Sequence, residues 1–204
     1  MVAGSSSRDG AAVIADLSLR WVVTILFSLS ALECGYAVAL SHRRPAAVVG
    51  HTLHFVMAVA MAVMAWPRGA ELPTTGPMVF FAAAAAWFLA VVLRSGGSWA
   101  RLVNAYHAVM MLAMAWMYAV MNGNLLPGQV TGHAGHEHAH GYPAWIAAIN
   151  WFWTVGFAVA AIGWTYRYFA GRQRAHGRMS MVHFGTLCQA MIATGMAIMF
   201  GVML

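Results

Sequence analysis

Six long apolar segments constrain the fold of this chain more than any other feature. They span residues 21–40, 46–66, 77–94, 102–122, 143–166 and 180–203. A helix needs about 20 mostly apolar residues to cross a bilayer, so the sequence predicts an all-α membrane protein with six transmembrane helices. The composition agrees, because only 8% of the residues are charged, whereas about a quarter is usual in soluble domains.

The domain organisation follows from the same segments. Residues 1–20 form a short polar N-terminal segment, and residues 21–204 form one six-helix transmembrane domain that leaves no room for a soluble domain. The stretch MVAGSSSRDG at the start lacks the basic and then apolar regions of a secretory signal. We therefore expect no cleavable signal peptide, and expect the first apolar segment to remain as a membrane helix.

The arginines alternate between the loops and predict the orientation in the membrane. The first, third and fifth loops carry Arg43 and Arg44, Arg94 and Arg101, and Arg167, Arg172, Arg174 and Arg178. The second loop sets Arg68 against Glu71, and the fourth has no arginine. Short basic loops stay in the cytoplasm, so both termini are expected outside the plasma membrane. Charges spread over separate loops in this way disfavour binding to nucleic acid.

Two of the apolar segments repeat one pattern of histidine and methionine, H-x-x-M-x-x-x-M-x-x-M. The members are His54, Met57, Met61 and Met64 in the second segment, and His107, Met110, Met114 and Met117 in the fourth. Both segments run in the same direction, so matched residues lie at similar depth. This repeat predicts three helical hairpins around an interior lined by histidine and methionine, as in other membrane proteins built from repeats. The sixth segment, with His183, is a weaker copy.

Histidines and one carboxylate are expected to share a layer near the cytoplasmic side. Glu33 lies near the inner end of the first segment, and His54, His107 and His183 lie at a comparable depth, with His51 beside them. Ionisable residues at membrane depth are rare and usually functional. Imidazole suits copper, zinc and iron, and thioether selects Cu(I), so the pattern favours copper. Methionine is also a common packing residue, and the stripes fit that alternative as well.

The outer loop, residues 123–142, holds a second group of candidate metal ligands. His133, His136, His138 and His140 surround Glu137. Short histidine-rich tracts bind metal, so this loop is expected to collect Cu(II) or Zn(II) outside the cell, unless it is simply a solvated loop.

The two cysteines lie inside apolar segments rather than in loops. Cys34 is in the first segment and Cys188 is in the sixth. This placement does not fit a disulfide framework. They are either small buried apolar residues or thiol ligands.

The repeated pattern resembles an actinobacterial family of integral membrane proteins known as domain of unknown function 5134. The resemblance covers residues 45–204 most clearly, and it implies a multi-pass plasma-membrane protein without an assigned activity. One departure concerns the sixth segment, where Thr186 stands at a position that a third copy of the stripe would give to methionine. A third column of methionines is therefore not expected.

Three functions fit these features. The first is a copper-binding membrane protein that transports copper, maintains its level, or delivers it to a membrane or extracytoplasmic copper protein. The second is a haem-b protein with His54 and His107 as axial ligands. The third is an assembly or structural subunit without a cofactor. The sequence has no phosphate-binding loop and no nucleophilic serine motif, which favours a binding role over an enzymatic one.

Overall fold

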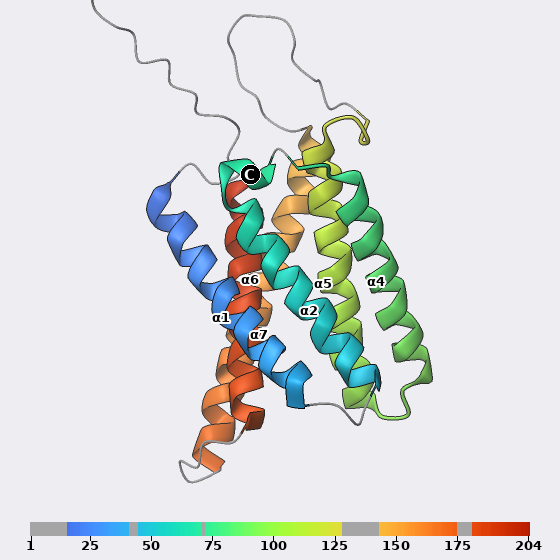
Figure 1. Cartoon of the computed structure of the whole chain (residues 1–204), viewed down its shortest axis with the longest axis vertical. Coiled ribbons are helices and arrows are strands. Elements are labelled where there is room, and N and C mark those ends of the chain that lie inside the picture. Colours follow the sequence, from blue (N-terminus) through green and yellow to red (C-terminus); the bar gives the residue numbers. More distant parts are fainter. Residues whose placement is uncertain (1–15, 41–44, 71, 128–142, 175–180) are drawn as a thin grey trace, which may run out of the picture.

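The described part of the chain is almost entirely helical. The computed structural model describes residues 16–40, 45–70, 72–127, 143–174 and 181–204 (Figure 1). The described residues form no strand, so the all-α class is confirmed. The helices are α1 (Leu17–Leu40), α2 (Pro45–Met64), α3 (Pro67–Ala70), α4 (Thr75–Arg94), α5 (Ser98–Asn122), α6 (Ala144–Arg174) and α7 (Met181–Val202).

The six long helices match the six apolar segments of the sequence. Five of them, α1, α4, α5, α6 and α7, are long and apolar enough to cross a membrane. The apolar part of α2 in the described residues, Val48–Met64, is shorter. The membrane-like character is therefore confirmed, whereas a sixth crossing and the orientation in the membrane stay predictions. The short helix α3 was not expected from hydropathy, because four residues leave no periodic pattern.

Local sequence explains where several helices begin and end. Pro45 opens α2 and Pro67 opens α3, which suits proline because the first helical residue needs no backbone N–H partner. Helix α5 ends where Gly123 takes a left-handed conformation with φ of 73°. Glycine adopts this conformation without steric cost. Proline thus opens two of the helices, and glycine closes a third.

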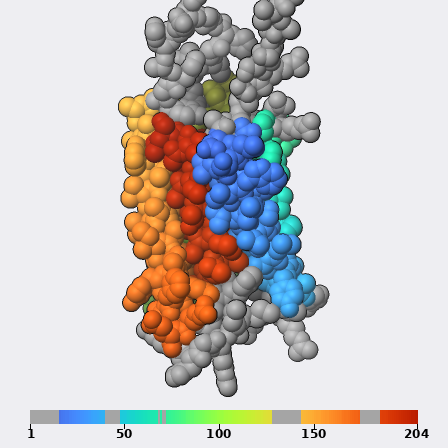
Figure 2. All heavy atoms as spheres, turned by 90° about the vertical axis from the view of Figure 1, so that its left-hand side faces the viewer, coloured from blue at the N-terminus to red at the C-terminus, as the bar shows by residue number. Residues whose placement is uncertain are grey.

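The long helices stand side by side and alternate in direction along the chain (Figure 1). Helix α1 packs closely against α2, α4 against α5, and α6 against α7. Helix α7 also packs against α1, and in Figure 2 it lies between α1 and α6. Close approach of α1 and α7 depends on Gly195, because a β-carbon there would lie 2.5 Å from the ring of Phe27.

The outside of the bundle is apolar, which fits a lipid surrounding. Leu32, Leu93 and Ile162 are 71%, 79% and 70% exposed. Soluble monomers rarely expose apolar surface on this scale. The interior is filled by phenylalanine, alanine and many methionines, and all six methionines of the repeated pattern are at most 1% exposed: Met57, Met61, Met64, Met110, Met114 and Met117.

Polar side chains tie helices together at the end of the bundle where α6 begins and α7 ends. The indole N–H of Trp116 donates to the buried Asn150 amide oxygen at 3.0 Å, and the Asn150 amide nitrogen donates to the Met203 carbonyl at 3.3 Å. The indole N–H of Trp66 donates to the Thr24 hydroxyl at 3.1 Å. These bonds connect α5, α6 and α7 and fix α1 beside the end of α2. The opposite half of the bundle contains a pocket.

Candidate functional site

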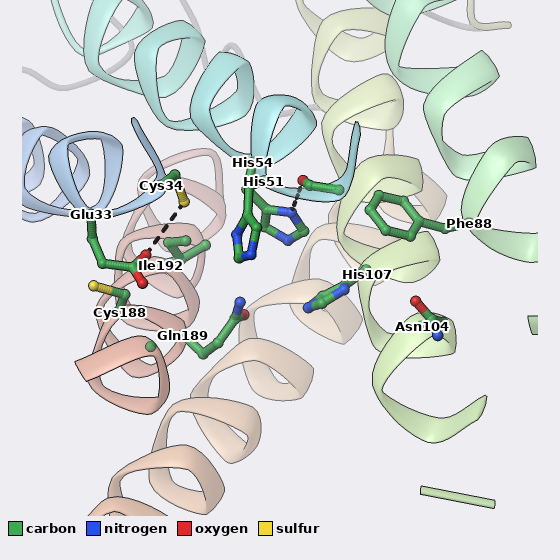
Figure 3. A pocket seen from close by; sticks show the side chains of 12 residues that line it. Glu33, Cys34, His51, His54, Phe88, Asn104, His107, Cys188, Gln189 and Ile192 are labelled. Carbon is green, nitrogen blue, oxygen red and sulfur yellow. Dashed lines mark hydrogen bonds between the residues drawn. The ribbon is translucent and has the colours of Figure 1, made fainter. Parts of the chain in front are cut away.

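A pocket of about 200 Å³ lies in the half of the bundle where α1 ends and where α2, α5 and α7 begin. Figure 3 shows its side chains converging from these helices and from α4. Its lining residues are Glu33, Cys34, Gly50, His51, His54, Phe88, Asn104, His107, Gly185, Cys188, Gln189 and Ile192. The pocket brings together Glu33, His51, His54 and His107 from the sequence prediction, and adds both cysteines.

His54 presents a bare nitrogen inside the pocket. The side chain is 4% exposed, and its Nδ1 lies 2.8 Å from the carbonyl oxygen of Gly50 (Figure 3). A carbonyl oxygen can only accept, so Nδ1 carries the proton and donates it. In a neutral imidazole the other nitrogen, Nε2, then holds a lone pair. This Nε2 is buried and has no hydrogen-bond partner in the part of the chain that the structure describes.

His107 supplies a second buried ring nitrogen. Its Nε2 also has no hydrogen-bond partner among the described residues. The rings of His54 and His107 are in edge-to-face contact, with centroids 4.3 Å apart and planes at 70°. Phe88 flanks both rings, at centroid distances of 5.7 Å from His54 and 5.3 Å from His107. Two unpartnered imidazole nitrogens in a largely apolar interior are costly unless a ligand or water satisfies them.

The other side of the pocket holds a carboxylate and two thiols. The Cys34 thiol donates to Glu33 Oε2, with Sγ and Oε2 3.6 Å apart (Figure 3). Cys188 of α7 lies near the same carboxyl group and interacts with it. Both cysteines are buried and neither forms a disulfide. Glu33 Oε1 lies 3.6 Å from the place where a β-carbon on Gly185 would be, so this carboxyl group reaches the backbone of α7.

His51 and Gln189 lie between the two sides of the pocket (Figure 3). Gln189 Oε1 is another buried atom that no described residue hydrogen-bonds. Sequence reasoning missed Gln189, Phe88 and Asn104 as site residues. An amide inside an apolar helix was the available signal for Gln189, because polar side chains at membrane depth need a partner. Phe88 gave no such signal, since phenylalanine is common in membrane helices.

Several predicted ligands are not brought together in a finished metal site. Among the described residues, no three histidine, cysteine, aspartate or glutamate side chains are arranged so that they could hold a metal ion as they stand. His183 belongs to α7, but its side chain lies outside the described residues. The loop histidines also lie outside them: His133, His136, His138 and His140. The ligand roles of these residues stay predictions.

The methionines occupy the core and not the pocket wall. None of the six methionines of the repeated pattern is a lining residue, although all are buried. Burial of this kind fits the packing alternative, because methionine fills irregular gaps between helices. On α7 the face that carries Cys188, Met196 and Met199 is buried as well. A role for the thioethers as metal ligands stays a prediction.

Comparison with known proteins gives a family and no activity. The sequence profile of the family described as domain of unknown function (DUF5134) matches residues 46–203. Uncharacterized proteins of Mycobacterium bovis and of two Mycobacterium tuberculosis strains are 47% identical to this chain over 209 residues. The match covers 94% of this chain and 99% of each relative. No solved structure matches.

Proposed function

The chain belongs to the DUF5134 family, and we propose that it is a multi-pass membrane protein that binds a soft transition-metal ion, copper before other metals. Binding would serve transport, homeostasis or delivery to a copper enzyme. The observation that carries the proposal is the pair of buried, unpartnered Nε2 atoms on His54 and His107, whose rings are in contact.

We infer that α1 with α2, α4 with α5, and α6 with α7 form three hairpins, and that all six long helices cross the membrane. The close packing within each of these pairs supports the arrangement. The alternation of arginine between loops supports an orientation with both termini outside. Under this orientation the pocket lies toward the cytoplasmic side. The predicted path through the methionines of α2 and α5 then lies between the pocket and the outer surface of the membrane.

The chemistry of His54 favours a metal ion as the missing partner. A histidine that ligates metal usually donates its other ring N–H to a carbonyl or carboxylate, which fixes the ring and raises the basicity of the free nitrogen. The bond from Nδ1 to the Gly50 carbonyl has this form. A bound ion would satisfy both orphan nitrogens at once. Water could satisfy them as well, so binding has to be measured directly.

The composition of the pocket favours a soft metal ion. Imidazole accepts copper, zinc, iron and nickel, thiolates select Cu(I) or zinc, and thioethers select Cu(I). The pocket contains His54, His107, Cys34 and Cys188. Copper is placed before zinc because the repeated pattern adds methionines to the histidines of the same two helices.

The haem-b alternative has less support from the geometry. Two axial histidines bind iron from opposite faces of the macrocycle, which then separates their rings. With metal–nitrogen bonds of about 2 Å, the ring centroids would be roughly 6 Å apart. Rings in direct contact at 4.3 Å leave no space between them for a macrocycle. A subunit without any cofactor would need buried water to satisfy the two nitrogens.

Copper binding by single variants tests the proposal. Purified protein in detergent would be titrated with Cu(I) against a chelator of known affinity. His107→Ala should remove most Cu(I) binding. Met78→Leu is the matched control, because Met78 packs against the core outside the pocket, and it should bind as the parent protein does. Equal retention of copper by both folded variants would overturn the proposal, and a haem absorption band in the purified protein would favour the alternative.

A further inference from the structure

Arg167 of α6 lies against an aromatic side chain of α5. Its guanidinium carbon is 4.0 Å from the ring centre of Trp99, in the first turn of α5, and 5.8 Å from that of Trp164 on its own helix. Trp164 in turn contacts Tyr106 of α5, with ring centroids 5.7 Å apart. These side chains bridge α5 and α6, and we call them the arginine–tryptophan cluster: Trp99, Tyr106, Trp164 and Arg167.

The outer face of α6 places this cluster at the edge of the apolar region. Exposed apolar side chains form a stripe along α6 from Phe152 to Phe169, and Tyr166 within it is 74% exposed. A helix rises about 1.5 Å per residue, so the stripe is about 26 Å long. This length is close to the hydrocarbon thickness of a bilayer, about 30 Å. Arg167 therefore lies where the lipid headgroups begin, a depth at which tryptophan and tyrosine are common.

The end of the bundle that carries the cluster, where α4 and α6 end and α5 and α7 begin, is rich in arginine (Figure 1). Eight of the eleven arginines of the sequence belong to the helix ends and connections here: Arg43, Arg44, Arg94, Arg101, Arg167, Arg172, Arg174 and Arg178.

Acidic residues are concentrated away from this end. Among the described residues the carboxylates are Asp16, which precedes α1 at the opposite end, and Glu33, which lines the pocket. The connections 41–44 and 175–180 lie outside the described residues, but their sequences contain no acidic residue. The remaining acidic residues belong to segments that are joined to the opposite end: Asp9, Glu71 and Glu137. An anion that pairs with Arg167 therefore has to come from the surroundings of the chain.

The stacked guanidinium is suited to binding phosphate. An indole covers the face of the guanidinium, whereas the N–H groups lie in its plane and point outward from its edge. Arginine binds phosphate through two parallel N–H···O bonds in this plane. Trp99 is 49% exposed, so the cluster can be reached from the lipid. A phosphate group can bind to the edge of Arg167 without displacing the indole of Trp99.

We propose that the arginine–tryptophan cluster binds the headgroup of an anionic phospholipid, with Arg167 as the phosphate ligand and Trp99 as the residue that orients its guanidinium. The acyl chains of this lipid lie along the apolar stripe of α6. The arginines of this end attract a headgroup with net negative charge and repel the ammonium group of a zwitterionic one. The site shares no residue with the pocket, and it is independent of metal binding.

Lipid binding to variants of the full chain tests the proposal. Purified, delipidated protein in detergent would be titrated with phosphatidylglycerol or phosphatidylcholine, and native mass spectrometry would measure the bound lipid. The parent protein should bind phosphatidylglycerol more tightly. Arg167→Gln should weaken binding of phosphatidylglycerol by at least about tenfold, because hydrogen bonds to a charged group are lost. Trp99→Leu keeps the charge and should also weaken this binding, because the guanidinium is no longer oriented.

Two further variants are matched controls. Arg172→Gln removes the same charge from the same end of α6. Charge alone is worth about fivefold per arginine near an anionic lipid surface, so this variant should lose no more than that. Trp87→Leu removes an indole of α4 that is exposed to a similar extent, 45%, and should bind as the parent does. Thermal unfolding shows whether each variant has folded, and Trp99→Leu keeps the test open if Arg167→Gln does not fold.

Three outcomes would overturn the lipid site. Equal losses in Arg167→Gln and Arg172→Gln would mean that only the net charge of this end attracts lipid. Displacement of phosphatidylglycerol by inorganic phosphate at equal concentration would reveal a site for small anions. Equal affinity of the parent protein for both lipids would exclude selection of an anionic headgroup. No metal ion enters these measurements, so their failure leaves the proposed metal binding unaffected, and a failure of copper binding leaves the lipid site unaffected.

Discussion

His54 of α2 and His107 of α5 touch edge to face, with ring centroids 4.3 Å apart, and neither Nε2 has a hydrogen-bond partner among the described residues. The contact joins two helices that are not neighbours in the chain. It also places the two leading histidines of the repeated pattern on a common pocket.

Removal of both histidines should cost no more Cu(I) affinity than removal of one. If the two imidazoles hold one ion, His54→Ala and His107→Ala each destroy the same site, and the double variant adds little. Groups that share one partner show coupling energies of about 0.5–3 kcal/mol. Chelator competition on the four proteins of the cycle measures the coupling. Additive losses would mean that the histidines act separately.

Gly195→Ala should lower stability by roughly 1–3 kcal/mol, the usual cost of overpacking. The new β-carbon would lie 2.5 Å from the ring of buried Phe27, so either this ring or the two helices must shift. Gly163→Ala in α6 is the matched control, since nothing lies within 4 Å of its added β-carbon. Unfolding of both variants in the same detergent provides the measurement. A similar loss in both variants would contradict the close contact of α1 with α7.

Replacement of core methionines by leucine should distinguish a role of these methionines in packing from a role in the passage of ions. Met61→Leu and Met114→Leu conserve volume in fully buried positions, so each should cost less than about 1.5 kcal/mol in stability. If the thioethers line the path to the pocket, Ag(I) should bind with nearly the parent affinity but enter more slowly. Stopped-flow binding gives the rate. If Ag(I) binds to these variants as fast as it binds to Met78→Leu, the methionines have a role in packing only.

The outer loop should capture metal without supporting the fold. Changing His133, His136, His138 and His140 together to alanine is expected to weaken metal uptake at low external concentration. Stability of the metal-free protein should change by no more than about 0.5 kcal/mol, as is usual for surface substitutions. Uptake by whole cells and thermal unfolding measure the two effects. A large drop in stability would show that the loop is structural.

Reporter fusions should reveal the orientation in the membrane. A reporter after residue 138 is expected outside the cell, and one after Gln173 is expected in the cytoplasm, because the fifth loop carries four arginines and the fourth carries none. Alkaline phosphatase activity reports the outer side, and fluorescence of a cytoplasm-dependent protein reports the inner side. The reverse result at both sites would invert the proposed orientation.

The sequence alone determined the helices and the depth of the residues along them. Hydropathy predicted all six long helices, because a run of about 20 apolar residues has one stable conformation in lipid. The repeated pattern placed His54 and His107 at similar depth on helices of the same direction, and both line one pocket. Glu33 was expected in that layer and also lines the pocket.

Only the tertiary structure decided which faces of the helices meet. Cys34 and Cys188 are far apart in the sequence, yet both reach Glu33, because α7 packs against α1 across Gly195. The methionines share a helical stripe with the histidines but fill the core and do not line the pocket. Periodicity fixes the depth and the angular spacing of side chains on one helix. The rotation of each helix about its axis depends on the packing of all its neighbours together, and that information is not local to any segment.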